Sequence, residues 1–227
     1  MEEMRGSIDA SRRSFRTRWW IANAAGFTVG HVVYSLVGHG VTGSHGDQLT
    51  SAQYVAHTIG LVSVAVIVFG LQRGALRSHV QVSRTRVAVG TAVFVAAFWL
   101  GAETTGPPAD WILGFTVLGT ACWIGLPSLT GSRSLSAAVT IVAFWGGLGT
   151  AAAVMFVLIR GGIFYPDSET LFNHTVFWVV LGGVTGAAGG YLSAWPLSRV
   201  VIPSNAAQQA VSPATAADER RGRTDLI

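Results

Sequence analysis

Histidines are the residues whose chemistry stands out in this sequence. Four of the six lie near the N-terminus, at His31, His39, His45 and His57. Neutral imidazoles bind transition metals, and two imidazoles on facing helices can hold a haem iron. Asp47 adds a carboxylate, which is a common metal ligand beside imidazole. One hypothesis is therefore a haem or metal site built on these histidines.

The spacing of these histidines favours no particular cofactor. His31 and His39 are eight residues apart, which turns them about 80° from each other on a helix. The sequence contains no His-x-x-x-His and no Cys-x-x-Cys pair. We therefore predict no cofactor, and His31, His39 and His57 are the candidate ligands if a haem or a metal binds. The alternative role for His31 and His57 is a structural hydrogen bond between helices.

The composition places these histidines in a membrane protein. Half of the 227 residues are hydrophobic, only 11% are charged and the mean hydropathy is +0.48, which leaves too little polar surface for a soluble domain. The sequence has no lysine, and this excludes a retinal Schiff base, a pyridoxal phosphate aldimine and a Walker-type phosphate site. Cys122 is the one cysteine, so no disulfide can form within the chain.

Six apolar segments predict an all-α membrane protein with six transmembrane helices. Crossing about 30 Å of hydrocarbon takes about 20 helical residues, and most of the segments reach that length. Their continuous apolar character favours helices over the alternating strands of a barrel. The segments are residues 19–41, 52–71, 87–102, 110–129, 135–159 and 172–202.

Arginines set the predicted orientation. Residues 1–18, 72–86, 131–134 and the C-terminal end hold five, four, one and four arginines, which is fourteen of the fifteen. Basic residues favour the cytoplasmic side, so both termini are predicted to be cytoplasmic. Residues 1–18 are then a basic tail or a helix on the membrane surface. Residues 19–202 form the bundle, and residues 203–227 form a disordered tail.

This orientation brings several polar side chains to the outer half of the bundle. His39 lies about 3 Å and His31 about 15 Å below the outer end of the first segment, and His57 lies about 8 Å down the second. Neighbouring helices would place them in one outward-facing polar pocket. The predicted members of this pocket are His31, Tyr34, His39, His45, Asp47, His57 and Glu103. His31 and His57 differ in depth by about 7 Å, which is awkward for two axial ligands of one haem.

Three stretches end in a similar way and predict three pseudo-repeated hairpins. The first is Gly70-Leu71-Gln72-Arg73-Gly74-Ala75-Leu76-Arg77, and glycine, leucine and arginine recur in this order at 125–133 and 190–199. The pattern resembles a broad group of small prokaryotic membrane proteins whose hairpins repeat a Gly-rich helix ending in a Gln-x-x-x-Leu-Arg-like signature. That group has no general assigned activity, so the resemblance implies architecture and not function. Pro127 and Ser193 replace the glutamine in the other two copies.

Glycines recur at helical spacing in two of the predicted spans. Gly182, Gly186 and Gly190 follow one another every four residues, as do Gly26 and Gly30. Such stripes let helix backbones approach closely in lipid. We therefore predict glycine packing between the helices.

The sequence carries no signature of catalysis or of ion coupling. No Asp, Glu or Arg lies in the middle of a predicted span, and no nucleophile motif is present. We expect a non-enzymatic accessory, binding or scaffold subunit of a prokaryotic cell membrane. The alternatives are a small-solute or lipid transporter with a site between the hairpin repeats, and a haem- or metal-binding protein using the outer histidines. The expected partners are the lipid bilayer and a membrane protein or a second copy of this chain, and not nucleic acid.

Overall fold

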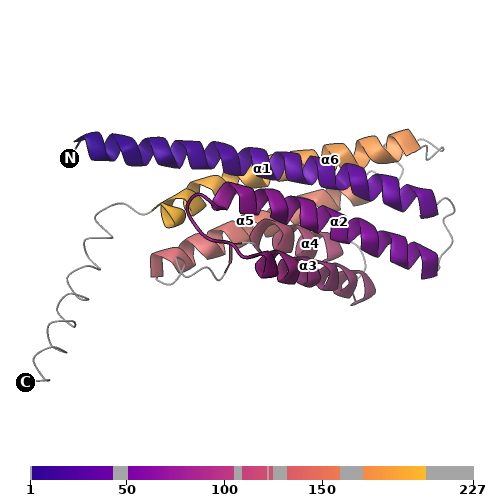
Figure 1. Cartoon of the computed structure of the whole chain (residues 1–227). Helices are drawn as coiled ribbons and strands as arrows, with labels where there is room; N and C mark the ends of the chain where they lie inside the picture. Colours follow the sequence, from indigo (N-terminus) through magenta and orange to yellow (C-terminus); the bar gives the residue numbers. More distant parts are fainter. Residues whose placement is uncertain are drawn as a thin grey trace, which may run out of the picture.

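The structure is a computed structural model that describes residues 2–42, 51–104, 109–121, 123–124, 132–158 and 171–202. These residues form six α-helices and no strand (Figure 1). In chain order the helices are α1 (Glu2–Thr42), α2 (Ser51–Leu76), α3 (Arg84–Thr104), α4 (Ala109–Thr120), α5 (Ser132–Leu158) and α6 (Leu171–Val201). The prediction of an all-α fold is confirmed for this part of the chain.

The helices pack as a closed ring. Each helix contacts the next one along the chain, and α6 returns to contact α1. Figure 1 shows α1 and α6 side by side and running in opposite directions. α2 also touches α4 across the ring. The interior of the ring is therefore bounded by side chains from distant parts of the sequence.

Four of the helices are long and apolar enough to cross a membrane. They are Gly6–Val37 within α1, Ser51–Leu76, Leu135–Met155 within α5 and Thr175–Val201 within α6. A span needs about 20 residues, whereas α4 has 12. The chain therefore has the helices of a membrane protein, and the crossing of all six helices stays a prediction.

The first helix is longer than the first predicted span. Residues 2–18 continue into that span as one helix, α1. Trp19 is fully buried, and Nε and Nη2 of Arg12 donate to the carbonyl of Ile202 at 3.1 and 2.9 Å. The basic N-terminal residues thus pack against the end of α6. The tail predicted at 203–227 lies outside the residues that the structure describes.

Two helix ends differ from the predicted segments for local reasons. α3 begins three residues earlier than predicted, because Ser83 Oγ accepts the backbone N–H of Arg86 at 3.1 Å and caps the helix. The segment predicted at 110–129 is helical in α4 as far as Thr120, and Ala121, Trp123 and Ile124 after it form a turn. There the N–H of Ile124 bonds back to the carbonyl of Thr120 at 2.9 Å and closes a turn.

Arginine side chains gather at one end of the ring. Five of them bond to a neighbouring helix end or connection, in the pairs Arg12–Ile202, Arg16–Ser198, Arg18–Ser78, Arg73–Val82 and Arg86–Ile124. These contacts bring together the N-terminal parts of α1 and α3 and the C-terminal ends of α2, α4 and α6. We call this side of the molecule the arginine end.

His79 lies in the turn after α2 and should make stability depend on pH. Its ring meets Phe15 edge-on at 5.5 Å between centroids. Burial lowers the pKa of His79 below its usual 6.5, and the Arg18 guanidinium lowers it further. Because the unfolded chain then binds more protons, the contribution of His79 is present above about pH 6.5 and is lost as the pH falls.

The measurement is the thermal midpoint in detergent between about pH 8 and pH 5. We expect the midpoint of His79→Gln to fall less over this range than that of the unchanged protein. Equal falls in the two proteins would contradict the assignment to His79.

Trp145 of α5 is wedged between glycines of two other helices. The indole is fully buried, and a Cβ added to Gly119 of α4 or Gly189 of α6 would overlap it. The ring also stacks on Phe27 of α1, with 5.3 Å between centroids. One side chain therefore fills the space where α1, α4, α5 and α6 meet.

A chain of buried hydrogen bonds links four helices. Gln72 of α2 is fully buried, and its Nε2 donates to Oδ1 of Asn23 and to the carbonyl of Leu118, both at 2.9 Å. Nδ2 of Asn23 donates to the carbonyl of Trp19 at 2.9 Å. Nε1 of Trp19 donates to Oγ of Ser193 at 2.9 Å. These bonds fix α1, α2, α4 and α6 relative to one another.

Candidate functional site

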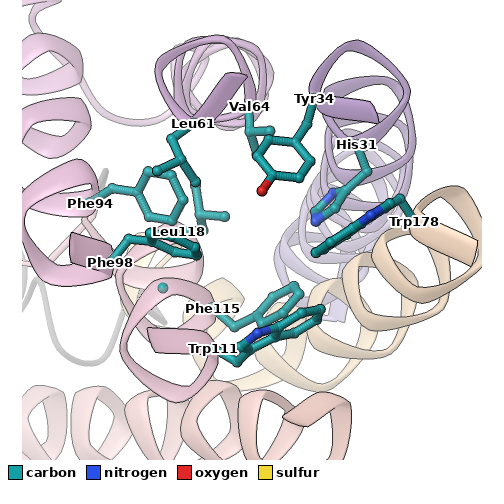
Figure 2. Close-up of a pocket in the computed structure, with 11 residues that line it drawn as sticks. His31, Tyr34, Leu61, Val64, Phe94, Phe98, Trp111, Phe115, Leu118 and Trp178 are labelled. Atoms are coloured by element: carbon teal, nitrogen blue, oxygen red, sulfur yellow. The ribbon is translucent and has the colours of Figure 1, made fainter. Parts of the chain in front are cut away.

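A small, partly open cavity of about 40 Å³ lies inside the ring. Five helices contribute to its wall, and aromatic rings make up most of it (Figure 2). The lining residues are His31, Tyr34, Leu61, Val64, Phe94, Phe98, Trp111, Gly114, Phe115, Leu118 and Trp178. One water needs roughly 10–15 Å³ measured in this way, so the cavity has room for two or three atoms or molecules of that size.

His31 is held in a fixed orientation at the edge of this cavity. Its Nδ1 lies 2.7 Å from the carbonyl of Phe27, one turn earlier in α1. A carbonyl only accepts, so Nδ1 carries the proton and Nε2 keeps the lone pair. The imidazole stacks on Phe115 at 6.0 Å and on Trp178 at 5.9 Å between centroids. Nε2 of His31, together with the hydroxyl of Tyr34, gives the wall its polar character.

Tyr34 connects the cavity to a second histidine. Its hydroxyl lies 3.0 Å from Nδ1 of His57 on α2, and its ring meets Trp178 edge-on at 5.0 Å. His57 itself does not line the cavity. The two histidines therefore lie in successive layers, His31 at the wall and His57 behind Tyr34. This bond between α1 and α2 matches the structural role considered for His57.

The structure brings together three members of the predicted polar pocket, which are His31, Tyr34 and His57. His39 and Glu103 belong to α1 and α3, but their side chains lie outside the described part of the structure, as do His45 and Asp47 entirely. The outward-facing pocket thus stays a prediction for its outer members. Of its inner members, His31 and Tyr34 border a cavity that is aromatic rather than polar.

The cavity does not fit a haem in its present shape. A porphyrin is far larger than 40 Å³, and the side chains around the space interlock through stacked rings. Among the described side chains, no three of the types His, Cys, Asp and Glu gather closely enough to hold a metal ion.

Sequence reasoning missed the aromatic wall. Trp111 lies near a predicted membrane interface, a position typical of belt residues, yet it is buried and stacks on Trp178 at 5.0 Å between centroids. Trp111 and Phe115 are one helical turn apart, so they share a face of α4. The spacing of Trp111 and Phe115 indicates an aromatic face on this helix, but it does not tell which other helix that face contacts.

A second, larger hollow lies on the outside, between α2 and α3. It has a volume of about 680 Å³ and an almost wholly apolar wall. Val62 and Val66 of α2 border one side, and valines and alanines of α3 border the other. Arg84 stands at the end nearest the arginine end of the ring. This surface is suited to contact with lipid chains.

The bond between Tyr34 and His57 gives a testable contribution to stability. We expect Tyr34→Phe to lower the free energy of unfolding by about 1 kcal/mol, because Nδ1 of His57 loses its partner. Tyr191→Phe is the matched control, since Tyr191 is 64% exposed on α6. Chemical unfolding in detergent measures both. Equal losses in the two variants would show that the bond contributes nothing of its own.

The architecture defines a helical membrane protein whose ring of helices surrounds a small aromatic cavity. No protein-family model matches the chain, and the comparisons with curated proteins and with solved structures also find no match. The resemblance to small prokaryotic hairpin proteins therefore rests on the sequence signature alone.

Proposed function

We propose that this chain is a non-enzymatic binding or scaffold subunit of the prokaryotic cell membrane. It crosses the membrane six times as three related hairpins, with both termini in the cytoplasm. The observation that carries this proposal is the tight interior. The cavity measures about 40 Å³, and Nδ1 of His31 and the hydroxyl of Tyr34 are both hydrogen-bonded to other groups of the chain. Such an interior favours a role for the outer surface.

The exposed surface supports this proposal. Large apolar side chains project outward from several helices, including Val55, Val66, Val139, Val180 and Val184, each at least 49% exposed. Apolar surface of this extent requires lipid or another membrane protein around it. The lipid bilayer and a partner subunit or second copy are therefore the expected contacts.

Native mass spectrometry after extraction in a mild detergent tests the proposal. We expect the protein to retain a second copy, a membrane-protein partner or bound lipid. A monomer that carries none of these would contradict the scaffold role.

The orientation is tested separately by labelling single cysteines in a Cys122→Ser background. Ser51 and Ser78 are exposed and lie at opposite ends of α2. In intact cells, an impermeant maleimide should label Ser51→Cys, and Ser78→Cys only after permeabilisation. The reverse pattern would overturn the proposed orientation, which rests on the arginines.

A small-solute transporter is the second candidate, favoured by the depth of the cavity. Leu61 and Val64, which line it, lie near the middle of α2, and transporter sites lie near the middle of the bilayer. Its aromatic wall suits a small apolar or cationic solute. Saturable binding of xenon, an apolar probe of a size suited to this cavity, that is lost in Gly114→Leu would favour a transporter. Absence of saturable xenon binding would favour the scaffold.

A further inference from the structure

Two guanidinium groups share one indole ring at the arginine end. Cζ of Arg16 on α1 lies 3.8 Å from the centroid of the Trp195 ring, and Cζ of Arg199 lies 4.9 Å from it. Trp195 is 47% exposed, so this group is open to the surroundings of the bundle. The ring attracts each cation. The two like charges, held by the same side chain, repel each other.

We call Arg16, Arg199 and Trp195 the arginine–tryptophan cluster. The positive charge of this cluster is only partly balanced. Arg12, one turn before Arg16, adds a third guanidinium whose charge acts on Arg16 together with that of Arg199. Among the described side chains, Asp9 is the one acid whose charge acts on Arg16. In this part of the chain, three cations against one exposed carboxylate leave an excess of positive charge. An anion placed here would relieve the repulsion between the arginines.

The cluster also has hydrogen-bond donors to spare. Arg16 uses Nε to donate to Oγ of Ser198 at 2.9 Å, which leaves both of its Nη groups. Arg199 donates no hydrogen bond to any residue in the described part of the chain. Guanidinium groups match phosphate oxygens in both charge and geometry. The free donors and the unbalanced charge point to the same ligand chemistry.

The surface next to the cluster suits acyl chains. Tyr191 and Trp195 are four residues apart and therefore lie on one face of α6. Tyr191 is 64% exposed, and Leu192 beside it is 39% exposed. This face leads from the arginines toward the middle of the span Thr175–Val201. A molecule with a phosphate at one end and hydrocarbon at the other would contact both parts.

We propose that Arg16, Arg199 and Trp195 bind the phosphate headgroup of an anionic phospholipid from the cytoplasmic leaflet. The choice of leaflet rests on the proposed orientation, in which the arginine end faces the cytoplasm. Arg12 contributes charge, while its own N–H groups hold the carbonyl of Ile202. Basic pockets between transmembrane helices are a recurring form of recognition for anionic headgroups.

Titration of the full-length protein in a neutral detergent tests this site. Phosphatidylglycerol is added, and bound lipid is counted by native mass spectrometry. We expect Arg199→Gln to raise the Kd for phosphatidylglycerol by about fivefold, because this is the usual effect of losing one arginine contact with an anionic lipid. Arg16→Gln should act in the same direction, and Arg199→Lys should retain part of the affinity. Phosphatidylcholine, which has the phosphate but no net charge, should bind more weakly.

Arg77→Gln is the matched control, because Arg77 is exposed just after α2, and α2 and α6 each pack extensively on α1 and not on each other. If it weakens binding as much as Arg199→Gln does, general surface charge explains the result and the site is overturned. No change in Arg199→Gln would also overturn it. Displacement of the lipid by glycerol 3-phosphate or inorganic phosphate at millimolar concentration would show a site for soluble anions and not for lipid.

Two further measurements separate lipid binding from the folding of the variant and from the orientation of the protein. An unchanged thermal midpoint without added lipid shows that Arg199→Gln is folded, which we expect because Arg199 is exposed. The cysteine labelling decides the leaflet separately. A monomer that is purified without protein or lipid would contradict the scaffold role, yet it can still bind phosphatidylglycerol when this lipid is added back, so the two proposals can fail separately.

Discussion

Replacing Gly119 by alanine is expected to lower the free energy of unfolding by about 3 kcal/mol. The new methyl group would overlap the indole of Trp145, and the atoms it meets belong to the rigid bicyclic ring. The ring has no room to retreat, because it touches Gly189 and stacks on Phe27 at 5.3 Å between centroids. Either α4 or α5 would have to move. Unfolding in mixed micelles, followed by circular dichroism, measures the effect.

Gly147 provides the control for this substitution. It lies on α5 two residues after Trp145, and nothing stands within 4 Å of the position that a Cβ would occupy. Gly147→Ala should be neutral or raise stability by roughly 0.5–1 kcal/mol, because alanine favours a helix over glycine. Trp145→Leu combined with Gly119→Ala should recover part of the loss. Equal stability of the two single alanine variants would refute the proposed packing of glycine against tryptophan.

Gln72→Leu is expected to cost roughly 1.5 kcal/mol, although leucine is the more apolar residue. The substitution removes the donor shared by Asn23 Oδ1 and the carbonyl of Leu118 and leaves both acceptors buried. The substitution also removes Oε1 of Gln72, which is buried and has no hydrogen-bond partner among the described residues. Loss of this unsatisfied acceptor is stabilising and opposes the loss of the two hydrogen bonds. Two unsatisfied acceptors outweigh one removed acceptor, so the net effect is destabilising.

The control for this prediction is Gln81→Leu in the connection before α3. Gln81 is exposed, so its substitution should change stability by less than about 0.5 kcal/mol. The same unfolding assay applies. If Gln72→Leu proves as stable as Gln81→Leu, the polar cluster does not hold the helices together.

The membrane helices could be predicted from the sequence more reliably than their ends. The second span was predicted to stop at Leu71, because Gln72 and Arg73 are polar, yet α2 continues to Leu76. The helix extends because Gln72 finds acceptors inside the ring and Nε of Arg73 donates to the carbonyl of Val82 at 2.7 Å. Composition along one segment does not reveal such partners. They belong to other helices.

The candidate site shows the same limit. His31 and Tyr34 were singled out because polar residues in an apolar segment are conspicuous. The aromatic wall that they border could not be assembled from the sequence. Its rings come from α3, α4 and α6, and helical periodicity gives the face of each helix without its neighbour. Trp178 shows this, because it contacts both His31 and Trp111 from a different helix.

The bond between Arg12 and Ile202 joins positions 190 residues apart in the sequence. The ring therefore closes only when α6 meets α1. Until then Trp19 lacks its partner on Ser193, and one side of α1 stays uncovered in the membrane. A chain that stops before α6 leaves that side bare and offers quality-control proteases an early target. The ring thus closes only after α6 has been synthesised.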